Sequence, residues 1–119
     1  MEKINLQQKL NLFSEHWSPH VVAELNGQQV KLAKLLGEFD WHVHADEDEL
    51  FWVISGQLEI QFRDRTVSLG PGELLVVPRG IEHRPVCTEE VCIALFEPAS
   101  TVNTGNQVTE KTKSALPRI

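Results

Sequence analysis

Alternating apolar and polar positions dominate the middle of the chain and predict short β-strands. Residues 58–62 alternate strictly between apolar and polar side chains, the pattern of a strand with one buried face. Asn26-Gly27 lies between two apolar runs and predicts a tight hairpin turn. In all we expect about nine strands, over residues 20–25, 30–36, 39–44, 49–54, 58–62, 66–69, 74–77, 83–86 and 91–96. No helical pattern recurs between them, which favours an antiparallel sandwich or barrel over a parallel α/β sheet.

The first 19 residues have a different period. Leu6 and Leu10 recur at helical spacing, Asn5 can cap the first turn, and Gln8 stands at the partner position of a capping box. We therefore expect a short helix in residues 1–19, ahead of the barrel.

The last 22 residues also depart from the strand pattern. Residues 98–119 are mostly polar and offer little to bury, so we expect a tail that is extended or lies over the surface of the body or of a partner. The length of 119 residues suits a single domain, with the barrel over residues 20–97.

Composition and charge exclude several classes of function. Hydrophobic residues make up 41% and charged residues 24%, as in an ordinary globular protein. A net charge of −6 leaves no basic surface for nucleic acid or an anionic membrane. No apolar run reaches the roughly 20 residues of a membrane span, and no secretory signal opens the chain, so we expect a cytoplasmic protein. The motifs of serine hydrolases, nucleotide hydrolases and dinucleotide enzymes are absent.

The pair His42 and His44 is the strongest chemical signal. On a strand, two residues one position apart point to the same face. Glu49 follows after a short acidic loop, and the turn over residues 78–80 would aim His83 inward. Imidazoles and a carboxylate suit a divalent transition metal, namely manganese, iron, cobalt, nickel, copper or zinc, among which the residue types do not choose. With Glu49 as the one charged ligand, the site would keep a net charge of about +1 and could bind an anionic oxygen, polarise a carbonyl or activate water.

The spacing of these residues resembles the two sequence motifs of the cupin superfamily. The first motif is a glycine, five residues, HxH, three or four residues, a glutamate, six residues and a glycine; here Gly37 lies one residue closer to the histidines, and Gly56 closes the motif. The second runs from Gly72 through Pro78-Arg79-Gly80 to His83, with Cys87 where the family has an asparagine.

The resemblance implies a small all-β, antiparallel jelly-roll barrel, commonly a homodimer, with a metal in the barrel mouth. It places the ligands at His42, His44, Glu49 and His83. The short one-domain form is similar to proteins labelled mannose-6-phosphate-isomerase-like, a label of fold rather than of activity.

Three functions fit such a chain. The first is a metal-dependent enzyme that acts on a small oxygen-rich or anionic molecule, as a dioxygenase, an isomerase or epimerase, or a decarboxylase. The second is a non-catalytic, metal-bearing module that binds or senses a small molecule. The third is a closed metal site that mainly stabilises the barrel.

Several charged residues have both a functional and a plain interpretation. Asp40 and Glu82 could act as general acids or bases near the metal, although solvated carboxylates are the more common case. Arg79 and Arg84 could bind a substrate carboxylate or phosphate, and are otherwise surface arginines. The acidic run 46–48 could attract a cation but is better interpreted as a solvated loop.

The aromatic and histidine residues outside the motifs are also open to two interpretations. Trp41, Phe51 and Trp52 could line a pocket, or pack in the core or at a dimer interface. His16 and His20 are interpreted as surface or packing residues.

The two cysteines, Cys87 and Cys92, are expected to be free thiols in a reducing compartment. Their spacing also suits a hairpin, in which a cross-strand disulfide is conceivable.

Overall fold

Local turn chemistry forms the first hairpin. In the computed structural model, which describes residues 1–119, β1 (His20–Leu25) pairs with β2 (Gln28–Glu38). The connecting residues Asn26 and Gly27 have φ of 52° and 78°, and a two-residue turn with positive φ at both positions matches the twist of a hairpin. The turn predicted from this dipeptide is confirmed.

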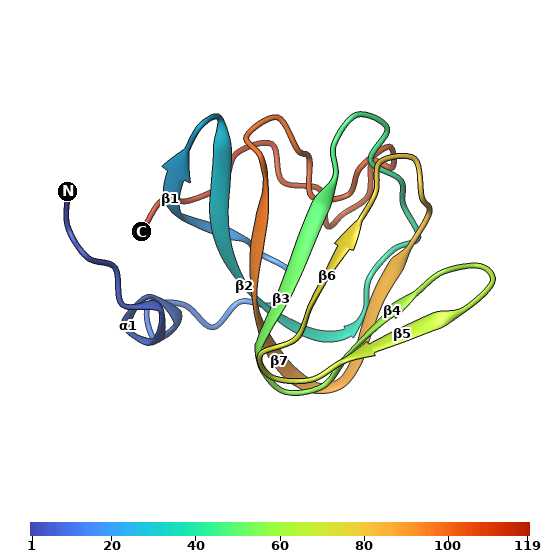
Figure 1. Cartoon of the computed structure of the whole chain (residues 1–119), viewed down its shortest axis with the longest axis horizontal. Coiled ribbons are helices and arrows are strands. Elements are labelled where there is room, and N and C mark those ends of the chain that lie inside the picture. The colour runs from blue at the N-terminus through green and yellow to red at the C-terminus, as the bar shows by residue number, and fades with distance from the viewer.

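The remaining strands complete an antiparallel barrel (Figure 1). They are β3 (Glu49–Ser55), β4 (Leu58–Gln61), β5 (Thr66–Leu69), β6 (Leu74–Val77) and β7 (Arg84–Pro98). The main path runs β1-β2-β7-β3-β6, while β4 pairs with β5 and with β7. The helix α1 (Leu6–Leu10) precedes them, and the Asn5 side chain accepts a hydrogen bond from the backbone N–H of Gln8. The all-β fold with a short N-terminal helix is as predicted.

The structure has a single strand, β7, where two separate strands were predicted over residues 83–86 and 91–96. It is one strand of 15 residues, because β2 pairs with both of its halves, through Gly37 opposite Cys87 and Leu35 opposite Val91. The polar residues 88–90 bulge out to solvent between these pairs. The hairpin that would have brought Cys87 and Cys92 face to face therefore does not exist, and both cysteines are free thiols.

A second correction concerns residues 39–44, which were predicted to form a strand. They belong to the connection between β2 and β3, and only His42 forms an isolated bridge, with His83. The connection lies beyond the end of β2, where a single partner residue is in reach instead of a ladder. The two histidines nevertheless point into the same cluster, with ring centroids 4.9 Å apart.

The barrel interior is mostly apolar and carries a polar cluster at one end. Inward-facing residues of β2, β3, β4 and β7 form the apolar core, which includes Leu35, Val53, Ile60 and Val91, all nearly inaccessible to solvent. The predicted ligands lie beside this core, where the connection 39–48 enters β3.

The C-terminal segment, residues 99–119, crosses that polar end of the barrel (red in Figure 1). It forms no helix or strand of its own, yet Thr101 and Thr104 are buried. Its end lies against β1, where the backbone N–H of Val21 donates to Pro117 and the N–H of Ile119 donates to Val21. Of the two tail conformations expected, the segment laid over the body is the one observed. No helix of the structure has the length and apolar character needed to span a membrane.

Candidate metal centre

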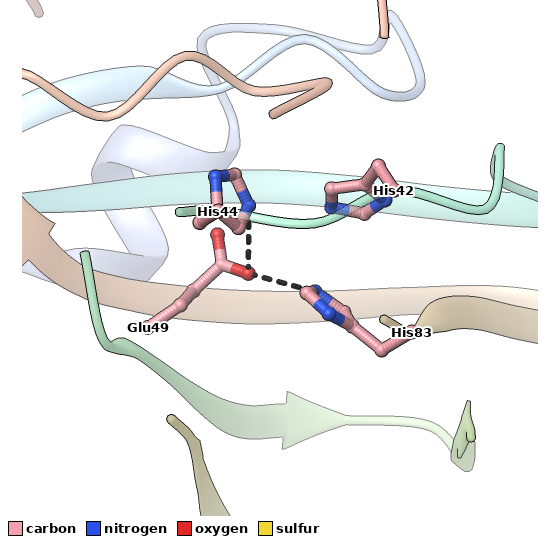
Figure 2. Close-up of side chains that lie close together, drawn as sticks. All are labelled: His42, His44, Glu49 and His83. Atoms are coloured by element: carbon pink, nitrogen blue, oxygen red, sulfur yellow. Dashed lines mark hydrogen bonds and ion pairs between the residues drawn. The ribbon is translucent and has the colours of Figure 1, made fainter. Parts of the chain in front are cut away.

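The four residues predicted as ligands lie together in the barrel mouth. The ligand atoms of His42, His44, Glu49 and His83 are all within 4.8 Å of one another, and all four residues are buried. Glu49 is the first residue of β3, and His83 directly precedes β7. Figure 2 shows His44 and His83 on either side of the Glu49 carboxylate, with Oε1 at 3.4 Å from His44 Nε2 and 3.2 Å from His83 Nε2.

Backbone carbonyls orient two of the imidazoles. His42 Nδ1 bonds the Asp40 carbonyl oxygen at 2.8 Å, and His83 Nδ1 bonds the Ile81 carbonyl oxygen at 2.9 Å. A carbonyl can only accept, so both rings donate through Nδ1, and Nε2 is the ring nitrogen that faces the cluster and is available to a metal.

His44 provides the test of whether these residues fit a metal. Neither of its ring nitrogens has a hydrogen-bond partner although both are buried, and the approach of Nε2 to Glu49 lacks the geometry of a hydrogen bond. A buried polar atom without a partner costs about 1–3 kcal/mol, so native structures rarely keep one. A metal ion among the four side chains would bind one of the two His44 ring nitrogens. We conclude that the residues fit a divalent metal.

A buried ion pair lies beside Glu49. Lys31 of β2 donates to Glu97 of β7 at 2.7 Å, and both side chains are only 2% exposed. Burial, together with the negative charge of Glu49, raises the pKa of Glu97 well above its usual value. Burial alone would raise the pKa of Glu49 as well, but the neighbouring His44, His83 and Glu97 lower it well below its usual value.

The lowered pKa keeps Glu49 ionised, as a metal ligand must be. Lys31 compensates the charge of Glu97, whose second carboxylate oxygen, Oε2, has no hydrogen-bond partner.

Acid is expected to destabilise the metal-free protein through His42. Burial, followed by the charge of His83, lowers the pKa of His42 from 6.5 to about 4. Between these two values the unfolded chain binds a proton that the folded chain does not, so stability falls with decreasing pH, by up to about 3 kcal/mol for this group. Urea denaturation with a chelator at pH 7, 5.5 and 4.5 measures the loss. In His42→Gln the free energy of unfolding should change less steeply with pH. A free energy of unfolding that stays constant from pH 7 to pH 4.5 would contradict the buried neutral imidazole.

A small cavity adjoins the cluster and is lined by two of its four side chains, His42 and Glu49. Its volume is about 40 Å³, comparable to the space of about three water molecules. His42, Glu49 and Glu97 form its polar side, while Trp17, Leu35, Phe39, Phe51 and Ile93 are among the apolar residues of its wall. Asn103 of the C-terminal segment also lines it. The candidate site is therefore a metal-ligand cluster beside a small, mostly apolar chamber.

Comparison with known proteins agrees with this geometry. The family model described as a cupin domain matches residues 30–96, more than half of the chain. The chain belongs to the cupin family. The match contains all four candidate ligands and ends one residue before Glu97.

Relatives of this cupin support the same assignment. It is 39% identical over 93 residues to the uncharacterized protein YdbB of Bacillus subtilis, over 75% of this chain and 82% of the relative. A cupin-2 domain containing protein from Shewanella frigidimarina is 52% identical with a TM-score of 0.79, over 80% of this chain and 93% of the other. Protein NMB1881 from Neisseria meningitidis is 33% identical with a TM-score of 0.76, over 82% of this chain and all of the other (100%).

Most of the other residues singled out from the sequence lie outside this cupin's site. Glu82 pairs with Arg63, Arg79 with Asp48, and Arg84 with Glu38, which makes these charges part of surface ion pairs. Asp40 takes part through its backbone carbonyl, as described above, while its carboxylate binds the C-terminal segment.

The aromatic and remaining histidine residues divide as follows. Phe51 lines the cavity, Trp52 faces outward from β3, and Trp41 stacks against Arg63 at 3.8 Å. His20 packs against the Phe13 ring, and His16 pairs with Glu90, so both have the packing or surface role expected of them.

Four residues near the site were missed by sequence reasoning. Lys31 and Glu97 share the strand parity of buried neighbours, Ala33 and Leu95, and this alternation is a signal that could have placed both inside the barrel. Trp17 and Asn103 come from segments without a periodic pattern, and no local signal places them at the cavity.

Proposed function

We propose that this cupin is a metal-dependent enzyme that acts on a small oxygen-rich or anionic molecule. The observation that carries the proposal is the unpartnered imidazole of His44, which points to a metal beside a cavity that can admit a ligand. A cluster used for packing alone would not keep two buried nitrogens without partners.

The residues around the cavity define what such a ligand would meet. Three neutral imidazoles and ionised Glu49 would leave a divalent metal with a net charge of about +1. When bound, a metal supplies Lewis-acid chemistry for oxygen atoms of a substrate. The apolar wall excludes water and strengthens the electrostatic contact with an anionic oxygen. Dioxygenase, isomerase or epimerase, and decarboxylase reactions all use this arrangement, and the small chamber favours a ligand with few non-hydrogen atoms.

Metal analysis combined with a substrate panel tests the proposal. Protein as isolated should contain about one divalent transition metal per chain, as expected for one four-ligand site. Turnover of a sugar, diketone, phenolic or thiol substrate should stop with a chelator and return with the metal. Metal-loaded protein that binds a compound tightly without converting it would instead support the binding or sensing module.

One observation favours the third candidate, a closed metal site that stabilises the barrel. The C-terminal segment lies across the site and leaves a cavity of only about 40 Å³. In that case, chelation would lower the melting temperature, and no compound of the panel would change it.

We also propose that two copies of the chain form a dimer through the outer face of β3, β6 and the end of β7. The face is apolar and carries no charged residue, and Trp52, Leu74 and Val76 are each 48% exposed on it. A second copy with the same net charge of −6 can pack here without bringing like charges together.

Light scattering should give about twice the chain mass of 13.5 kDa, and Trp52→Glu should return the monomer mass. Val108→Glu, at an isolated residue that is 91% exposed, is the control, and a monomeric wild type would contradict the dimer.

A further inference from the structure

The connection that carries His42 and His44 has no strand ladder to hold it. On its inner side, His42 and His83 exchange two backbone hydrogen bonds, at 3.1 and 3.0 Å, and the N–H of Gly80 donates to the His44 carbonyl. These bonds tie the first pair of candidate ligands to the segment that carries the last one. They leave the outer side of the connection to other partners.

Asn106 occupies that outer side. Its backbone N–H donates to the Val43 carbonyl at 2.9 Å, and its side-chain Oδ1 accepts from the Val43 N–H at 3.0 Å. Val43 is the residue between the two histidines, so both of its backbone groups are held by one residue of the C-terminal segment. This two-point contact replaces the neighbouring strand that the connection lacks.

Gly105 allows this close approach. It has a φ of 57°, and a Cβ at this position would collide with the Val43 carbonyl and lie 3.2 Å from His42 Cδ2. Only glycine combines this conformation with so little space. The segment thus passes so close to His42, a candidate ligand, that there is no room for a side chain at Gly105.

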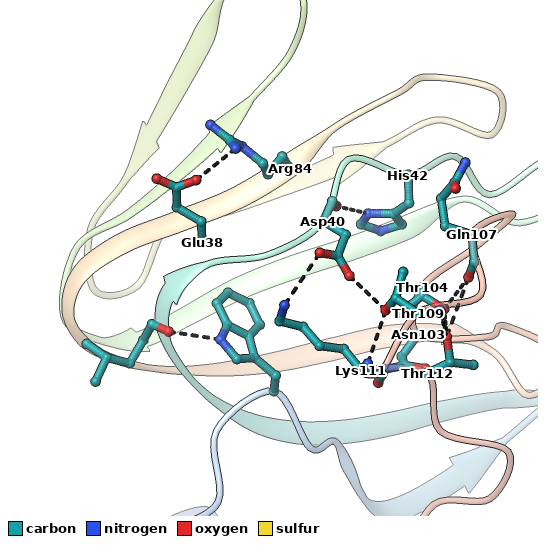
Figure 3. A network of polar contacts seen from close by, with 12 residues as sticks. Glu38, Asp40, His42, Arg84, Asn103, Thr104, Gln107, Thr109, Lys111 and Thr112 are labelled. Atoms are coloured by element: carbon teal, nitrogen blue, oxygen red, sulfur yellow. Dashed lines mark hydrogen bonds and ion pairs between the residues drawn. The ribbon is translucent and has the colours of Figure 1, made fainter.

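A second contact reaches His42 through Asp40. The Asp40 carboxylate accepts a hydrogen bond from Thr109 Oγ1 at 2.8 Å and pairs with Lys111 Nζ at 3.4 Å (Figure 3). The carbonyl of the same residue orients the His42 ring. The C-terminal segment therefore holds both Asp40, two residues before His42, and Val43, between the two histidines.

The segment is itself well anchored. Thr104 is fully buried, and its hydroxyl bonds the Gln107 carbonyl and the Thr112 hydroxyl, both at 2.6 Å. Such internal bonds let the segment act as a rigid support rather than as a loose tail.

We propose that Asn106 is a positioning residue of the metal centre, which holds the backbone between His42 and His44 so that both imidazoles meet Glu49 and His83. The inference rests on the proposed metal binding. It assigns a role to residues 99–119, which lie outside the stretch matched by the cupin domain model.

Metal affinity of matched variants tests this role. Asn106→Ala removes the acceptor for Val43, and we expect the affinity for Co²⁺ and Zn²⁺ to fall about 10–100-fold, as when other groups that orient ligands are removed. Asn106→Asp keeps an acceptor oxygen and should restore most of the affinity. Gln107→Ala is the control, since Gln107 is also exposed and its side chain makes no hydrogen bond. Competition with a chromophoric chelator gives the affinities, and the visible absorption of the Co²⁺ protein reports the ligand geometry, which a merely structural role would leave unchanged.

Each outcome has one meaning. Equal affinity and an unchanged Co²⁺ spectrum in Asn106→Ala would overturn the inference while wild-type binding upholds the proposed metal centre. Wild type that binds neither metal would overturn the metal centre, and the inference with it. Should Asn106→Ala fail to fold, Thr109→Val decides, because it removes the bond to Asp40 at nearly constant volume; about tenfold weaker binding supports the role of the segment, and no change overturns it.

Discussion

Replacement of His44 by alanine is expected to abolish stoichiometric metal binding. The four candidate ligand atoms lie within 4.8 Å of one another, and His44 is the only one of the three histidines whose imidazole has no other partner. Removing groups that merely orient ligands costs about 10–100-fold in metal affinity, so loss of a ligand should cost at least about 100-fold. Metal content by mass spectrometry and titration with Zn²⁺ measure the loss.

Stability measurements separate this effect from a folding defect. Without metal, His44→Ala opens a small cavity but also removes two unpartnered nitrogens, so the metal-free variant should stay within about 1–2 kcal/mol of wild type. The rise in melting temperature on metal addition should disappear. His16→Ala, at a half-buried histidine paired with Glu90, is the control and should keep both metal and stabilisation. Full metal stoichiometry in His44→Ala would refute its assignment as a ligand.

The largest effect on stability is expected from Lys31→Met. The side chains of Lys31 and Glu97 are each 2% exposed, and the negative charge of Glu49 also acts on Glu97. Methionine fills much of the same volume but leaves the buried negative charge without its cation. Breaking a buried pair in this way costs about 3–5 kcal/mol, a large share of the stability of a domain of this size. Urea denaturation of metal-free protein measures the difference in the free energy of unfolding.

Two further variants identify the cause. In Lys31→Met/Glu97→Leu both partners are apolar, and most of the lost stability should return because no buried charge of the pair remains. Lys34→Met lies on the same strand but on the outer face, where Lys34 donates to the Phe13 carbonyl, and should cost about 1 kcal/mol. If Lys31→Met lowered the free energy of unfolding no more than Lys34→Met does, the buried pair would contribute little to stability.

Three of the four candidate ligands could be predicted from the sequence because they are close together along the chain. His42 and His44 are separated by one residue, and Glu49 opens the following strand, so short-range geometry brings these three together. His83 joins them through pairing between distant segments, which the resemblance to the cupin motifs supplied. The predicted strand over residues 39–44 was wrong because alternation describes which way side chains point but not whether a partner strand is present.

Other features depended on contacts that no local pattern encodes. A polar run over residues 88–90 resembles a turn, but pairing of β2 on both sides of it keeps β7 in one direction. No sequence pattern distinguishes Thr104 and Gly105 from ordinary tail residues. The folded chain buries Thr104 and brings Gly105 against Val43 and His42.

The sequence by itself determined the Asn26-Gly27 turn, the strand parity and the identity of the candidate ligands. These follow from φ preferences, from the alternation of side chains and from the short distances between neighbouring residues. Tertiary structure alone decided that the connection carrying His42 and His44 is supported by His83 on one side and Asn106 on the other, and that Lys31 and Glu97 meet beside Glu49. These contacts join residues tens of positions apart, and their formation depends on how the whole barrel closes.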